Sequence, residues 1–142
     1  MAITTKYKGN QSRMTTTKKR ILLVDDEPDI TSSLKMGLEY SEDEFKVDTF
    51  NDSIEALSNY KTGYYDLLLL DIKMPKMNGF ELYQKIKEID DKVKVCFITA
   101  FEHYYDEFKG VLPELNERCF ARKPITIDDL ARRIKKELNN DN

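Results

Sequence analysis

The sequence predicts an α/β protein built on a doubly wound, five-stranded parallel sheet. Short apolar runs alternate along the chain with segments that have the periodicity of amphipathic helices. Turn and capping residues separate these segments, and the repeated order of strand then helix is typical of βα crossovers. Right-handed crossovers place helices on both faces of the sheet. The chain has 142 residues, a length that suits one domain.

The first strand is predicted at residues 20–25, RILLVD, an apolar run of the kind found in strands that are buried on both faces. Pro28 suits the first turn of the helix that follows. Ile30, Leu34 and Leu38 recur at helical spacing, so we expect them on the buried face of that helix.

The second strand is predicted at residues 45–50, FKVDTF, where apolar and polar residues alternate. Asn51 or Asp52 can cap a helix that continues to Tyr60. We expect the inward-facing side chains of this helix to be Ile54, Leu57 and Tyr60.

The third and fourth strands are predicted at residues 66–71, which contain four consecutive leucines, and at residues 94–99, KVCFIT. Asn78 can cap the helix between them. The side chains expected to line the buried face of this helix are Phe80, Tyr83, Ile86 and Ile89.

The C-terminal part predicts a weaker fifth strand at residues 118–121 and a last helix that begins near Thr126 and Asp129, a pair resembling a capping box. Residues 103–108 favour a helix, and Pro113 should end or restart it. The inward-facing residues of the last helix are expected to be Leu130, Ile134 and Leu138.

Charge is unevenly distributed along the chain. Six of the 23 Lys and Arg residues, and none of the 26 Asp and Glu residues, lie among the first twenty positions, which leaves the remainder with a charge of −9. We therefore expect a disordered basic tail at residues 1–18, a folded domain at residues 19–138 and a short tail at residues 139–142. The acidic domain argues against direct binding to nucleic acid.

The sequence favours a cytoplasmic protein. No apolar run is long enough to span a membrane, and the basic tail lacks the apolar region of a signal peptide. The two cysteines, Cys96 and Cys119, do not form a CxxC motif and are expected to be reduced thiols.

Polar side chains stand where the predicted strands end. The first strand ends in Asp25 and Asp26, the third in Asp71, the fourth in Thr99, and Lys123 follows the fifth. The carboxyl ends of parallel strands share one edge of the sheet, where ligands bind in such folds. Three carboxylates at one edge repel one another, and Mg²⁺, which prefers carboxylate and water oxygens, relieves that repulsion.

The same groups suit phosphoryl transfer. Asp71 can act as a nucleophile that forms an acyl phosphate. Mg²⁺ and Lys123 can neutralise two phosphoryl oxygens, and the Thr99 hydroxyl can donate a hydrogen bond to a third. The chain is thus predicted to accept a phosphoryl group on Asp71.

Four motifs, VDDEP, LLLLDIKMPKMNG, FITAF and ARKP, occur in an order and at spacings that resemble the receiver domain of two-component response regulators, over residues 19–138. The resemblance implies the flavodoxin-like (βα)5 receiver fold. It also implies that Asp25, Asp26 and Asp71 hold Mg²⁺, with Mn²⁺ as an alternative ion, and that the backbone carbonyl of Lys73 completes the metal site.

The resemblance further implies that Thr99 and Phe120 are switch residues, and that the Lys123–Pro124 peptide bond is often cis. In receivers, the side chains at the positions of Lys73 and Phe101 flank the path of the water that hydrolyses the acyl phosphate. The bulky apolar Phe101 therefore predicts slow self-dephosphorylation.

The partners implied are a sensor histidine kinase or a phosphotransfer protein, and a protein target that binds the face formed by the fourth helix, the fifth strand and the fifth helix. The short distance from Leu138 to the last residue leads us to expect a stand-alone receiver without an output domain, which signals in trans. Homodimerisation on phosphorylation, and no contact with nucleic acid or membrane, are also expected.

Two other functions fit parts of the pattern. An Mg²⁺-dependent phosphatase with an aspartyl nucleophile needs an acid two residues after Asp71, and Lys73 stands there instead. A degenerate receiver that serves as a binding scaffold usually lacks a site residue, and none is missing here. We therefore expect no enzymatic activity beyond the domain's own phosphorylation and dephosphorylation.

Overall fold

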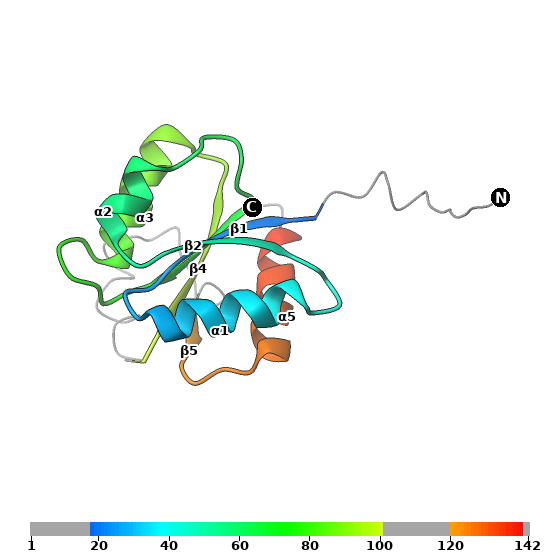
Figure 1. Cartoon of the computed structure of the whole chain (residues 1–142). Helices are drawn as coiled ribbons and strands as arrows, with labels where there is room; N and C mark the ends of the chain where they lie inside the picture. Colours follow the sequence, from blue (N-terminus) through cyan, green and yellow to red (C-terminus); the bar gives the residue numbers. More distant parts are fainter. Residues whose placement is uncertain (1–17, 101–119, 141–142) are drawn as a thin grey trace.

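The computed structural model describes residues 18–100 and 120–140, and within these ranges one sheet contains five strands. The strands are β1 (Arg20–Val24), β2 (Lys46–Phe50), β3 (Leu67–Asp71), β4 (Lys94–Thr99) and β5 (Phe120–Arg122). Each neighbouring pair is parallel, and the order across the sheet is β2-β1-β3-β4-β5 (Figure 1). The predicted doubly wound parallel sheet is confirmed.

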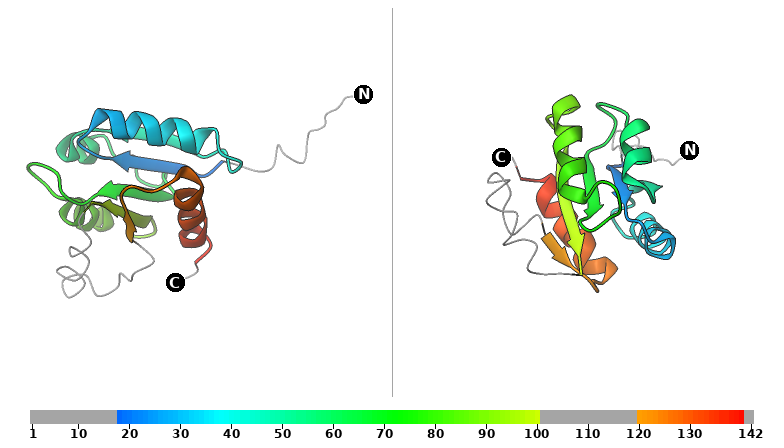
Figure 2. Two further views of the ribbon diagram at one scale, coloured as in Figure 1. Left: turned by 90° about the horizontal axis from the view of Figure 1, so that it is seen from below. Right: turned by 90° about the vertical axis from the view of Figure 1, so that its left-hand side faces the viewer.

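Helices cover both faces of this sheet. Among the described residues they are α1 (Pro28–Glu39), α2 (Ser53–Ser58), α3 (Gly79–Ile89) and α5 (Ile127–Leu138). The views in Figure 2 show α1 and α5 on one side and α2 and α3 on the other. No helix in the described ranges is long and apolar enough to cross a membrane.

The four leucines of β3 explain how the two layers are held together. Leu68 and Leu70 belong to the hydrophobic cluster under α2 and α3, whereas Leu67 and Leu69 belong to the cluster under α1 and α5. All four are fully buried. Because side chains of a strand alternate between the two faces, a continuous apolar run is what a central strand with helices on both sides requires.

The predicted helix starts at Asn78 and Thr126 are confirmed. Asn78 and Glu81 form a reciprocal capping box, in which each side chain accepts a hydrogen bond from the other residue's backbone N–H. The Thr126 hydroxyl accepts from the backbone N–H of Asp129. These bonds satisfy N–H groups that the first turn of a helix leaves without intrahelical partners.

Two predicted inward-facing residues are wrong. Ile54 is 42% exposed and Ile89 is 51% exposed. The short α2 buries Ser53 and Ala56 instead, and at about 100° per residue Ile54 points away from that face. In α3 a spacing of three residues drifts around the helix, so that Ile89 has rotated about half a turn from Phe80.

Other boundaries need smaller corrections. Asp52, and not Asn51, caps α2, and α2 ends at Ser58 before the predicted limit of Tyr60. β5 begins at Phe120, while the first two residues predicted for it lie outside the described ranges. The predicted N-terminal tail up to residue 17, the helix at 103–108, Phe101 and Cys119 also lie outside them.

Candidate functional site

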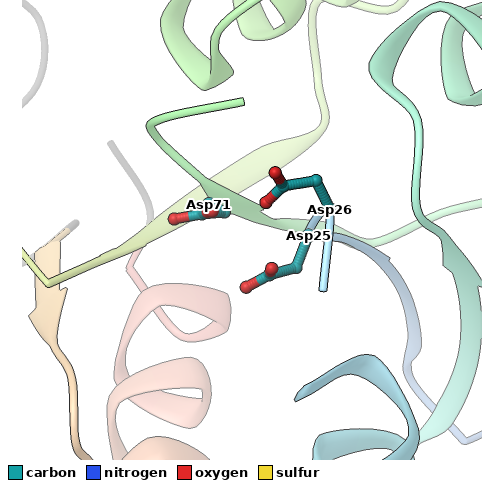
Figure 3. Close-up of side chains that lie close together, drawn as sticks. All are labelled: Asp25, Asp26 and Asp71. Atoms are coloured by element: carbon teal, nitrogen blue, oxygen red, sulfur yellow. The ribbon is translucent and has the colours of Figure 1, made fainter. Parts of the chain in front are cut away.

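Three carboxylates meet at the carboxyl edge of the sheet. Asp25 and Asp26 follow β1, Asp71 ends β3, and these two strands are neighbours. One carboxylate oxygen of each residue lies within 4.8 Å of those of the other two (Figure 3). Asp25 and Asp71 are buried, whereas Asp26 is exposed. The convergence expected from the strand ends is therefore present in the structure.

Lys123 brings a positive charge to the same place from the end of β5. Its Nζ lies 2.9 Å from the Asp25 carboxylate, 3.6 Å from the Asp71 carboxylate and 3.9 Å from the Glu27 carboxylate. The backbone N–H of Lys123 donates to the carbonyl of Thr99 at 2.8 Å, which joins the ends of β4 and β5. The Lys123–Pro124 peptide bond is cis, in agreement with the resemblance.

The electrostatic balance of the cluster remains negative. Burial and the charges of Asp25 and Asp26 raise the pKa of Asp71, the charge of Lys123 opposes them, and the net result is a pKa of about 7. Burial by itself lowers the pKa of Lys123, but the hydrogen bond to Asp25 and the charge of Asp71 outweigh this effect, so the net shift is upward. One ammonium group among three carboxylates leaves an excess of negative charge, and this donor set fits a hard divalent cation such as Mg²⁺.

The chain after Asp71 is held tightly against α3. The backbone N–H of Ile72 donates to Ile98, and the carbonyl of Ile72 accepts from Gly79 at 2.8 Å. A Cβ atom on Gly79 would lie 2.3 Å from the carbonyl oxygen of Asp71. Only glycine allows the start of α3 to approach the backbone of Asp71 this closely. Our sequence interpretation identified Asn78 as the helix cap but did not predict this contact of Gly79.

Thr99 and Phe120 occupy neighbouring strands beside the site. Thr99 ends β4 and is buried. The Phe120 ring is half-buried and stacks on Phe97 with 5.3 Å between ring centroids, and it lies 6.0 Å from Phe80. The predicted switch positions therefore lie on the two strands that Lys123 joins. Lys73 is exposed in the loop after β3, and Phe101 is outside the described residues.

Asn51 is a second residue that sequence reasoning did not place at the site. Its side-chain amide donates to the backbone carbonyl of Asp25 at 2.8 Å and to the Thr31 hydroxyl at 3.0 Å. The neighbouring Asp52 caps α2 and also accepts from Lys76, in the loop between β3 and α3, at 3.1 Å. The sequence offered only one indication of this role, which is the position of Asn51. It directly follows the second predicted strand, whose carboxyl end lies at the same edge of the sheet as the acids.

Comparison with known proteins gives a consistent result. The family model for the response regulator receiver domain matches residues 21–135. The transcriptional regulatory protein TrcR of Mycobacterium tuberculosis is 31% identical over 82% of this chain and 44% of its own length. The transcriptional regulatory protein PrrA of Mycobacterium leprae is 34% identical over 82% of this chain and 48% of its own length. The response regulator ArlR of Staphylococcus aureus is 32% identical over 82% of this chain and 51% of its own length. The chain spans about half the length of the curated relatives it matches.

Solved structures share the fold over most of the chain. The response regulator protein TrrA of Thermotoga maritima, solved in complex with Mg²⁺-BeF, is 35% identical with a TM-score of 0.70, covering 83% of this chain and 97% of its own. A receiver domain from Clostridium thermocellum is 28% identical with a TM-score of 0.74, covering 85% and 94% of the two chains. The non-phosphorylated HemR receiver domain of Leptospira biflexa is also 28% identical with a TM-score of 0.74, covering 88% and 98%.

Proposed function

The chain belongs to the response regulator receiver domain family, and on this premise we propose that it is a switch that accepts a phosphoryl group on Asp71 from a histidine kinase or a phosphotransfer protein. The observation that supports this proposal most directly is the cluster of Asp25, Asp26 and Asp71 with Lys123 against it. A buried carboxylate beside an ammonium group, at the edge of a rigid sheet, is suited to act as a phosphoryl acceptor.

In the proposed reaction, a carboxylate oxygen of Asp71 attacks the phosphorus atom of a phosphohistidine. The new P–O bond forms as the P–N bond breaks, and the imidazole leaves with the bonding electron pair and takes a proton from solvent. Lys123, already 3.6 Å from Asp71, donates to one phosphoryl oxygen, and the Thr99 hydroxyl donates to another. Both donors stabilise charge on the transferred group.

The carboxylates of Asp25, Asp26 and Asp71, with the backbone carbonyl of Lys73, would hold the metal ion. Bound Mg²⁺ supplies positive charge that neutralises phosphoryl oxygens, and Mn²⁺ suits the same oxygen donors. The excess of negative charge in the cluster supports this assignment, and so does the burial of two of its three acids.

The proposed switch depends on the ends of β4 and β5. Hydrogen bonds from Thr99 and Lys123 to the phosphoryl group draw these two residues toward Asp71, and the space that Thr99 leaves lets the Phe120 ring turn. The bond between the Lys123 N–H and the Thr99 carbonyl supports coupling of the two strand ends. Phosphorylation then shifts an equilibrium between two arrangements of the same fold.

The lifetime of the phosphorylated state is proposed to depend on Lys73 and Phe101, which flank the path of the attacking water in the family. A bulky apolar side chain at Phe101 hinders that water, so Phe101→Asn should shorten the half-life of the acyl phosphate. An unchanged decay rate, measured after removal of the phosphodonor, would contradict the role proposed for Phe101.

The output is proposed to be a protein partner that binds in trans to the face made by the fourth helix, β5 and α5, in the cytoplasm, with homodimerisation on phosphorylation. Direct contact of this domain with nucleic acid or membrane is not part of the proposal, because the acidic balance of residues 21–142 disfavours binding to polyanions. Capture experiments with the phosphorylated and unphosphorylated chain, and light scattering of both, test the partner and the dimer.

Labelling with acetyl phosphate tests the central proposal. In the presence of Mg²⁺, the intact mass of the wild type should rise by one phosphoryl group, and the increase should be absent for Asp71→Asn and absent in EDTA. Asp91→Asn, which removes an exposed carboxylate after α3, is the matched control and should label like the wild type. Equal labelling of Asp71→Asn would disprove the assignment, and steady turnover of a generic phosphomonoester would indicate a phosphatase instead.

A further inference from the structure

Asn51 lies at the end of β2 and reaches across to the turn that carries two of the three acids. Its side-chain amide donates to the carbonyl oxygen of Asp25 and to the Thr31 hydroxyl, and that hydroxyl donates to the carbonyl of Pro28 at 3.0 Å. One amide group therefore joins the end of β2, the turn after β1 and the first part of α1.

These contacts have no evident role in forming α2. Asp52 supplies the cap, because its carboxylate accepts from the backbone N–H groups of Ile54 and Glu55. The Asn51 amide points instead at the peptide that links Asp25 to Asp26. An explanation of Asn51 thus has to be sought in the turn that it contacts.

The contact fixes the peptide between the two acids. The backbone N–H of Asp25 donates to Phe50 at 3.2 Å, so the bond from Asn51 anchors the carbonyl side of a residue whose amide side is already held by β2. The Asp25 carboxylate is held separately by Lys123 and by the backbone N–H of Glu27. Asp26 is exposed, and its backbone nitrogen belongs to the peptide whose carbonyl accepts from Asn51, so the orientation of this peptide determines where the Asp26 side chain leaves the backbone.

We propose that Asn51 is a positioning residue for the metal site, which orients the Asp25–Asp26 peptide so that both carboxylates face Asp71, and that Thr31 in turn orients the Asn51 amide. The inference rests on the proposed function, in which these three acids hold Mg²⁺. Groups that orient metal ligands commonly change metal affinity by about tenfold or more when they are removed.

Binding of Mg²⁺ to the full chain, followed by the backbone amide shifts in NMR, tests the proposal without any phosphoryl transfer. Asn51→Ala should raise the Kd for Mg²⁺ about tenfold. Asn59→Ala is the matched control, because the Asn59 amide also donates to a backbone carbonyl, that of Glu55, but away from the acids. This variant should bind Mg²⁺ like the wild type, and thermal unfolding in EDTA verifies that both variants fold.

Thr31 offers a second and independent pair of variants. Thr31→Val removes the buried hydroxyl with little change of shape and should raise the Kd less than Asn51→Ala does. Thr31→Ser keeps the hydroxyl and should restore the wild-type Kd. Because Thr31 acts through Asn51, the double variant should bind Mg²⁺ no more weakly than Asn51→Ala alone.

The outcomes separate this inference from the proposed function. If the wild type binds Mg²⁺ and Asn51→Ala binds it within about twofold of the Asn59→Ala control, a much smaller change than removal of an orienting group produces, the positioning role is wrong and the metal site stands. If the wild type shows no Mg²⁺-dependent shifts at the three acids, the metal site and this inference both fail. Equal losses for Thr31→Val and Thr31→Ser would refute the part assigned to the hydroxyl.

Discussion

Replacing Asp71 by Asn should stabilise the metal-free protein, and the gain should grow with pH. The folded-state pKa of Asp71 is about 7, raised by burial and by the charges of Asp25 and Asp26, whereas an unfolded chain releases this proton near pH 4. Between these two values the folded protein binds one more proton than the unfolded chain does. The free energy of unfolding of the wild type therefore falls as pH rises across this window, and Asp71→Asn removes that loss.

The magnitude follows from the size of the shift. A difference of about three pKa units corresponds to about 4 kcal/mol at most, at about 1.4 kcal/mol per unit. About a tenth of the Asp71 side chain is exposed, and Lys123 lies 3.6 Å away, so solvent and the ammonium group screen part of the repulsion. We therefore expect Asp71→Asn to raise the free energy of unfolding by about 2 kcal/mol at pH 8, and by less than half of that at pH 5.

Urea denaturation in EDTA at several pH values from 5 to 8 measures this gain. Asp91→Asn, which removes an exposed carboxylate away from the three acids, is the control variant and is measured over the same pH range. The raised pKa of Lys123 does not affect the comparison between pH 5 and pH 8. The stability that the protonated Lys123 contributes is fully present below about pH 10 and is lost only above it. A gain for Asp71→Asn that is the same at pH 5 and pH 8 would refute the reasoning. Added Mg²⁺ should shrink the gain, since it binds the wild-type carboxylates more tightly.

Three further substitutions test the supports of the site by urea denaturation. Gly79→Ala should cost about 2 kcal/mol through the clash with the Asp71 carbonyl, and a neutral effect would show that α3 can move away. Lys123→Met should destabilise the protein by about 2 kcal/mol at pH 8 and by less at pH 5, because the acids lose their ammonium partner; equal losses at both pH values would contradict this. Asn78→Ala should cost about 1 kcal/mol by removing the capping box, more than Asn59→Ala, whose amide is exposed.

The parts of the fold that could be predicted are those in which one physical rule dominates. The run of four leucines in β3 is short and is followed by turn residues, which favours a strand covered on both faces, and the structure shows such a strand. Asn78 and Thr126 were predicted as caps because the helix N-terminus requires an acceptor and these side chains supply one. The meeting of Asp25, Asp26 and Asp71 followed from the shared edge of parallel strands.

Other features depend on geometry that periodicity does not describe. Ile54 and Ile89 are apolar residues at helical spacing, yet both are exposed. Ile54 points away from the face that α2 buries, and a spacing of three residues drifts around α3. The contacts of Asn51 and Gly79 are set by the distance between elements far apart in sequence. Such distances are known only once the elements have packed. The sequence motifs that contain the three acids therefore did not predict the contacts of Asn51 and Gly79.

The energy of the acid cluster explains why the apolar strand β3 leads directly into Asp71 and the turn that follows it. The acid cluster opposes folding by about 2 kcal/mol at neutral pH, which is close to what burial of one leucine side chain contributes. β3 buries four leucines directly before Asp71, so the strand stays in place although the charge at its end is unfavourable. Hydrogen bonds from the Gly79 N–H to the Ile72 carbonyl and from the Ile72 N–H to the Ile98 carbonyl hold the chain directly after Asp71. Binding of a proton or a cation relieves the repulsion among the acids, so the cluster favours a bound divalent cation, and such an ion would also offset the negative charge that a phosphoryl group adds to Asp71.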